Sequence, residues 1–155
     1  MPRSRIGGDR LMVTAQRIAE TLGGARVLKR KRATLEELQA QLRAGLPYSA
    51  LEAVASGFEI GTADLAAVLH VPPRTLARRK RAKRLRADES DRLFRLGRIA
   101  ALAETVLGDR EKATRWLHQA NRALGSATPL HQLDTELGAR QVEDVLLRIA
   151  HGTYS

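Results

Sequence analysis

The chain has 155 residues, and its 27 lysines and arginines outnumber its 17 aspartates and glutamates, which gives a formal net charge of +10. This length suits one domain or two small ones, and 43% hydrophobic residues are enough for a core, which argues against wholesale disorder. The absence of cysteine excludes disulfides, thiolate metal sites and cysteine nucleophiles. Neither a signal-like start nor a run of the roughly eighteen apolar residues that span a bilayer is present. We therefore expect a cytoplasmic protein with no membrane partner.

The positive charge is gathered in the first part of the sequence. Residues 1–98 contain 21 basic and 10 acidic side chains, whereas residues 99–155 contain 6 and 7. Two runs dominate, one over residues 26–32 and one over residues 74–86. Arginine supplies 22 of the 27 cations, which suits bidentate contact with phosphate and guanine but can equally reflect genomic base content. The clustering itself indicates a nucleic-acid surface.

Helical periodicity runs through the whole sequence, so the expected fold class is all-α. Apolar residues from Leu11 to Leu22 predict a first helix that closes at Gly23-Gly24, and the basic run after it is expected to be a linker or arm. Thr34 with Glu37 forms a capping box before a helix that ends at Gly45. Its expected apolar face is Leu35, Leu38 and Leu42, and a further helix follows through Leu51 and Val54.

Residues 62–80 have helix-turn-helix spacing. Thr62 is expected to cap a helix that buries Leu65, Val68 and Leu69, Val71 to fill the turn, and Pro73 to start a second helix on which Leu76 faces inward. The side chains expected to be exposed on that second helix and its extension, and to bind DNA, are Arg74, Thr75, Arg78, Arg79, Lys80 and Lys83. The alternative is a purely structural hairpin with a solvated basic face.

The second half predicts a long helix from about Ser90 to Gly108 and a next helix capped by Asp109. Ala113, Trp116, Leu117 and Ala120 are its expected apolar face, with Trp116 as a core anchor. A loop then closes on a Thr128 cap with Pro129 in the first helical position. The last helix carries Val142, Val145, Leu146 and Ile149, and a short tail follows it.

The order of these elements, and the residues in them, resemble an Xre/MbcA/ParS-type antitoxin from about residue 34 to the end, with departures at Ala120 and Ser126. The matching residues are Arg84-Leu85, Glu89-Ser90-Asp91-Arg92-Leu93, Ala101-Leu102-Ala103-Glu104, Gly108-Asp109, Ala113, Trp116-Leu117, Asn121, Ala123-Leu124-Gly125, Thr128-Pro129-Leu130, Leu133-Asp134-Thr135, Gly138, Val142, Leu146, Ile149, Gly152 and Tyr154.

The resemblance implies a protein that holds a RES-domain, NAD-degrading toxin inactive and represses its own operon by binding operator DNA. It implies an Xre-like helix-turn-helix domain over residues 34–88 and a helical toxin-binding domain over residues 89–155. Residues 1–33 lie outside the resemblance, and their own pattern predicts an N-terminal helix and a basic arm or linker. By position, the family's tail at the toxin's active site corresponds to Gly152, Thr153, Tyr154 and Ser155. The rival hypothesis is a free-standing transcriptional regulator or partition-type protein with no toxin partner.

Nothing in the sequence predicts an enzyme, a cofactor or a metal site. The four histidines, at positions 70, 118, 131 and 151, lack metal-ligand spacing, and neither a phosphate-binding loop nor a nucleophile elbow is present. We expect His70 at a helix end, and His118 and His131 at surface or loop positions. Because one small helix-turn-helix makes few base contacts, we also expect a homo-oligomer or a toxin–antitoxin hetero-oligomer.

Overall fold

The structure is a computed structural model and describes residues 13–29 and 33–152. Among these residues every named element is a helix, which confirms the all-α class. The helices are α2 (Ala15–Thr21), α3 (Gly24–Leu28), α4 (Leu35–Ala44), α5 (Tyr48–Gly57), α6 (Thr62–Leu69), α7 (Pro73–Ala82), α8 (Ala87–Leu107), α9 (Arg110–Leu117), the 3-10 helix η1 (Arg122–Leu124), α10 (Pro129–Gln132) and α11 (Glu136–His151).

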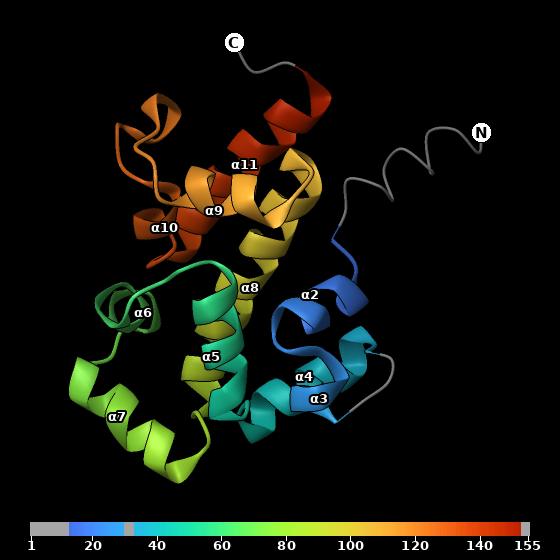
Figure 1. Cartoon of the computed structure of the whole chain (residues 1–155), viewed down its shortest axis with the longest axis vertical. Helices are drawn as coiled ribbons and strands as arrows, with labels where there is room; N and C mark the ends of the chain where they lie inside the picture. The colour runs from blue at the N-terminus through green and yellow to red at the C-terminus, as the bar shows by residue number, and fades with distance from the viewer. Residues whose placement is uncertain (1–12, 30–32, 153–155) are drawn as a thin grey trace.

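Helix α8 is the central element of the molecule. Its inner face includes Leu93, Leu96, Ile99 and Ala103, which are all fully buried. Helices α2, α4 and α6 pack on it from the first half of the chain, and α9 and α11 from the second half (Figure 1). One hydrophobic cluster therefore connects both halves. The domain boundary expected between residues 88 and 89 falls inside this helix, and the division into three parts stays a prediction.

Most helix ends follow from local sequence. The side chains of Thr34, Asp109 and Thr128 accept hydrogen bonds from backbone N–H groups three residues later, over 2.8–3.2 Å, as expected of N-caps. The expected Thr62 cap is wrong. Gly61 has the extended backbone of the N-cap and its carbonyl accepts from the Leu65 N–H, so that Thr62 is already the first helical residue.

The N-terminal segment is more ordered than the sequence predicts. Helix α2 ends at Thr21, and the basic run begins inside a second short helix, α3, instead of in a linker. The reason is that Leu28 is buried in the core and its carbonyl accepts a hydrogen bond from Gln41, which anchors the C-terminal end of α3. Leu11 and residues 30–32 lie outside the described residues.

Three expected core positions differ from prediction. Leu35 is 68% exposed, because it occupies the first position of α4 and the described part of the chain does not cover it. Ala120 is exposed because α9 already ends at Leu117. Trp116 packs against the core as expected, yet remains partly exposed. Terminal turns of a helix are less covered by neighbours than its middle, which a periodicity argument does not include.

Candidate nucleic-acid interface and C-terminal surface

Helices α6 and α7 form the expected helix-turn-helix. His70 ends α6 in the left-handed conformation, with φ of 58°, and the Val71 N–H returns to the Ala66 carbonyl over 3.0 Å. Val71 packs against the core, as expected of the residue that fills the turn. Pro73 takes the first position of α7, where a missing N–H costs nothing, and Leu76 is buried.

Cations cover the outer side of α7 and its C-terminal end. Arg74, Arg78, Lys80 and Lys83 are all exposed, as predicted, and so is Arg81. Arg74, Arg78 and Arg81 are spaced four and three residues apart, which places them on one face of the helix. Helix α7 lies at the edge of the molecule, away from α9, α10 and α11 (Figure 1). These exposed side chains form a cation stripe that is open to a large anionic partner. Its residues are Arg74, Arg78, Lys80, Arg81 and Lys83.

The structure corrects the expected exposure of Thr75. Its side chain is only 8% exposed, and together with Leu76 it forms the buried side of α7. A helix rotates by about 100° per residue, so these neighbours share an inward-facing sector while Arg74 lies outside it. The expectation that Thr75 faces outward is wrong, and in this packing it cannot reach a base edge.

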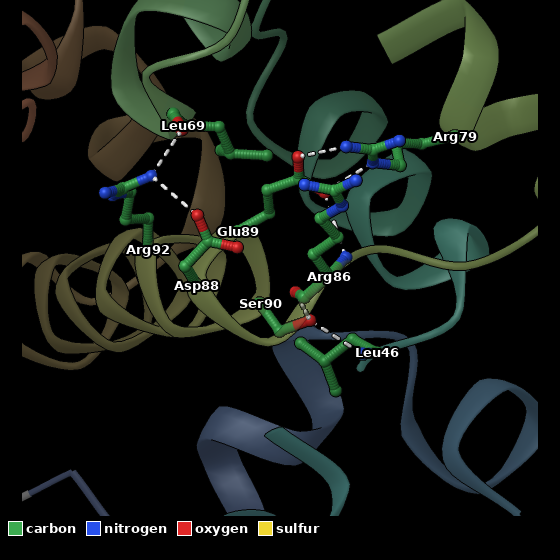
Figure 2. Close-up of polar contacts among 8 residues, drawn as sticks. All are labelled: Leu46, Leu69, Arg79, Arg86, Asp88, Glu89, Ser90 and Arg92. Atoms are coloured by element: carbon green, nitrogen blue, oxygen red, sulfur yellow. Dashed lines mark hydrogen bonds and ion pairs between the residues drawn. The ribbon is translucent and has the colours of Figure 1, made fainter. Parts of the chain in front are cut away.

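Arg79 is also not on the exposed side. Its side chain is 12% exposed and forms a bidentate pair with Glu89, with Nε donating to Oε1 over 2.8 Å and Nη2 donating to Oε2 over 3.0 Å (Figure 2). Glu89 is 2% exposed, and a carboxylate this buried requires a counter-ion. No local pattern in the sequence predicts this pair, because Arg79 lies on α7 and Glu89 on α8.

Glu89 is held as a carboxylate by several groups. Burial raises its pKa, but the hydrogen bonds from Arg79 and from the Arg86 backbone N–H, with the charges of both arginines, outweigh burial and lower the pKa overall. The same pair raises the pKa of Arg79, mainly through its hydrogen bond to Glu89. Both groups are therefore charged at neutral pH.

A short crossing of chain segments supports the end of α7. The Leu85 N–H donates to the Leu46 carbonyl over 2.9 Å, and the Tyr48 N–H donates to the Lys83 carbonyl over 3.0 Å. Gly45 precedes this crossing with φ of 93°, and a Cβ atom there would lie 2.2 Å from the Leu85 carbonyl oxygen. Only glycine fits this close approach.

The C-terminal surface is described only up to Gly152. This residue closes α11 in the left-handed conformation, with φ of 70°, and is exposed. Thr153, Tyr154 and Ser155, the other residues expected to bind a toxin, lie outside the described residues. On the first turn of α11, Leu137 is 69% exposed.

Three histidines connect the helix-turn-helix half to the C-terminal half. His70 is hydrogen-bonded to the Asp134 carbonyl, His131 lies 3.3 Å from the Asp64 carboxylate, and His118 lies 3.0 Å from the Phe58 carbonyl. His70 is at a helix end as predicted, but these contacts were missed. They join residues 60 to 67 positions apart in the sequence. A single histidine does not indicate which distant residue it will contact.

Two family models match successive parts of this structure. The model described as the antitoxin Xre-like helix-turn-helix domain matches residues 37–98, and that of the antitoxin Xre/MbcA/ParS C-terminal toxin-binding domain matches residues 102–152. A relative named antitoxin Xre from Photorhabdus laumondii subsp. laumondii is 35% identical over 120 residues, which cover 76% of this chain and 81% of the relative. The chain belongs to the Xre/MbcA/ParS family of antitoxins.

Two further relatives named antitoxin Xre agree with this membership. The one from Pseudomonas putida is 47% identical over 83 residues, which cover 53% of this chain and about half, 52%, of the relative. The one from Yersinia enterocolitica is 29% identical over 116 residues, which cover 74% of this chain and 78% of the relative. The order expected from sequence, a helix-turn-helix domain followed by a helical toxin-binding domain, is thereby confirmed.

Within residues 13–29 and 33–152, no three histidine, aspartate or glutamate side chains gather in a way that could hold a metal ion. No helix in the same ranges is both long and apolar enough to cross a bilayer.

Proposed function

We propose that this chain is the antitoxin of a RES-domain, NAD-degrading toxin, and that it represses its own operon by binding operator DNA through α7. The observation that carries the proposal of DNA binding is the exposed cation stripe on the second helix of a helix-turn-helix. Membership of a family with a toxin-binding domain over residues 102–152 supports the proposal of toxin binding. A protein that binds operator DNA and an NAD-degrading toxin would act in the cytoplasm.

The stripe divides into two chemical roles. Arg74 lies in the first turn of α7 and Arg78 follows one turn later on the same face, and the early residues of such a second helix reach base edges in the major groove. Lys80 and Lys83 lie at its end, where cations meet the DNA backbone and fix the register without reading sequence. Because each small domain reads few bases, we propose that two chains act on half-sites about one helical turn apart.

Salt-dependent binding to duplex DNA tests the DNA-binding half. If about five phosphates are neutralised, log affinity should fall with log salt at a slope of roughly −4 to −5. Replacing Arg74, Arg78, Lys80 and Lys83 together by alanine should abolish measurable binding to a duplex from the upstream region of the gene. Replacing Arg115 and Arg122, two exposed cations of the second half, should leave it intact. Unchanged binding by the quadruple variant would contradict the proposed surface.

For the toxin, we propose that the tail from Gly152 to Ser155 enters the substrate pocket. Gly152 directs the chain out of α11 at an exposed position, which suits a segment offered to a partner. The ring of Tyr154 can be buried while its hydroxyl keeps a hydrogen bond, and the carboxylate of Ser155 can pair with cations of the kind that hold NAD phosphates. Such a segment loses conformational entropy on binding, which its contacts must exceed.

Cellular NAD measured during co-expression with the cognate RES toxin tests this mechanism. A chain ending at His151 should stay helical and bind DNA as the full chain does, yet protect NAD less well. Equal protection by both chains would assign neutralisation to the helical surface alone. Protection by neither, or the absence of a RES-domain reading frame beside the gene, would favour the free-standing regulator or partition-type protein instead.

A further inference from the structure

The C-terminal half of α7 carries the cations but has almost no apolar attachment. The buried residues of α7 are Thr75 and Leu76, both in its first turn, and the stretch from Ala77 to Ala82 contributes no buried side chain to the core. Just beyond the helix, Leu85 is buried and the Lys83 carbonyl accepts from the Tyr48 N–H, so the chain is attached on both sides of this stretch but not along it. Apolar packing therefore leaves the direction in which Arg78 and Lys80 point to the polar contacts of the stretch itself.

The pair of Arg79 and Glu89 is placed to do this. Arg79 lies in the middle of the unpacked stretch, and both oxygens of Glu89 accept from its guanidinium, at 2.8 and 3.0 Å (Figure 2). A two-point contact between planar groups fixes orientation as well as distance, which a single ion pair does not. The side chains are 12% and 3% exposed, so water and salt screen the pair little.

The acceptor is itself rigidly mounted on α8. Glu89 also accepts from the Arg86 N–H over 2.9 Å, and its neighbour Ser90 accepts from the Leu46 N–H and donates to the Arg86 carbonyl, both over 2.7 Å. One turn later Arg92 donates to the Leu69 carbonyl at the end of α6, over 3.1 Å. The first turns of α8 are thus bonded to α6 and to the segment before α5 (Figure 2).

We propose that Arg79 is a positioning residue for DNA binding rather than a DNA contact, and that Glu89 is the acceptor through which α8 sets the direction of α7. This inference rests on the proposed DNA-binding function. Arg79 is one cation in a surface that also includes Arg78, Lys80, Arg81, Lys83 and Arg86. Glu89 offsets its charge and occupies its donors, so the surrounding cations remain for phosphate and bases.

The variant Glu89→Gln tests the proposal by the sign of its effect. This substitution removes a negative charge and releases Arg79 from its ion pair. If the released Arg79 then contacted a DNA phosphate, the affinity for duplex DNA would rise and the dependence of log affinity on log salt would steepen. If the pair positions α7, affinity should fall by roughly tenfold or more, the scale of losing one or two well-placed contacts, without a steeper slope. Affinity equal to or above that of the wild-type chain overturns the proposal.

A matched control makes the same charge change elsewhere on α8. Glu104→Gln also removes one carboxylate from an ion pair, that with Arg110 at 3.3 Å, but it lies at the other end of the helix from α7. Its DNA affinity should match the wild type or exceed it slightly. A loss as large as that of Glu89→Gln would overturn the positioning role, because it would be a general effect of altering α8.

Arg79→Lys gives an independent test that keeps the charge and an ion pair, should Glu89→Gln fail to fold. Lysine cannot reproduce the two-point contact, so positioning predicts weakened binding, whereas a phosphate contact predicts nearly wild-type affinity and overturns the proposal. Amide hydrogen exchange in this variant should quicken in residues 77–82 and stay unchanged in α11.

A wild-type chain that does not bind duplex DNA overturns the proposed function and this inference together. If the wild-type chain binds duplex DNA and the Glu89→Gln and Arg79→Lys variants bind it equally well, the inference alone is overturned.

Discussion

At the scale of single residues, backbone contact decides where glycine is required. Gly138, on the first turn of α11, would place a Cβ atom 1.9 Å from the Gln132 carbonyl oxygen, whereas a Cβ at Gly61 would meet nothing within 4 Å. Gly138→Ala should therefore lower the free energy of unfolding by about 3 kcal/mol, the upper end for overpacking against an element that cannot move aside. Gly61→Ala should be close to neutral. Urea unfolding compares the two, and equal stabilities would contradict the close approach of α10 to α11.

The carboxyl of Glu89 makes stability depend on acid pH. Its pKa in the folded chain is below the ordinary value of 4.5, so the stabilisation is complete above that value and is lost as pH falls through the folded pKa. At pH 7, Glu89→Gln should be less stable than the wild type by about 3 kcal/mol, because one partner of a buried pair is removed. Urea titrations from pH 7 down to pH 3 should show this difference narrowing below about pH 4.5. A difference that stays constant over the range would mean that Glu89 contributes packing rather than charge.

At the scale of elements, α7 should show two separable effects on DNA binding. Arg74→Ala with Arg78→Ala should relax sequence preference, because each well-placed arginine–base contact discriminates by about 1–3 kcal/mol. Lys80→Ala with Lys83→Ala should instead weaken binding to all duplexes alike and lower the salt slope by about two. Competition between upstream and unrelated duplexes measures the difference. Identical effects of the two double variants would contradict the assignment of Arg74 and Arg78 to base contacts.

At the scale of the whole molecule, α8 makes the two matched domains one packing unit. Leu96 is fully buried on the helix that contacts elements of both halves, so Leu96→Ala should cost about 2–5 kcal/mol. Helical circular dichroism reports on both halves, whereas the fluorescence of Trp116, the only tryptophan, reports on the second. The two signals should melt together and shift together in the variant. Separate transitions would mean that the toxin-binding half folds without the helix-turn-helix half.

The sequence by itself determined the features that depend on neighbouring residues along the chain. The N-caps at Thr34, Asp109 and Thr128, the stop at Gly108 and the turn from His70 to Pro73 are formed within a few residues, so local chemistry is sufficient to predict them. The family resemblance could be found for the same reason, because its motifs are mainly these caps, stops and apolar repeats. The exposure of Arg74 and Arg78 followed from helical periodicity.

Only the tertiary structure decided which cations remain available and how the halves meet. Thr75 and Arg79 share α7 with the exposed arginines, but Thr75 packs inward and Arg79 is paired with Glu89 on the next helix, an arrangement that depends on where α8 lies. The contacts of His70, His118 and His131 join residues 60 to 67 positions apart in the sequence. Leu35 is uncovered because no described element reaches it. Periodicity specifies which side of a helix is apolar, whereas the neighbour that covers each side, and the charge it brings, is set by the packing of distant segments.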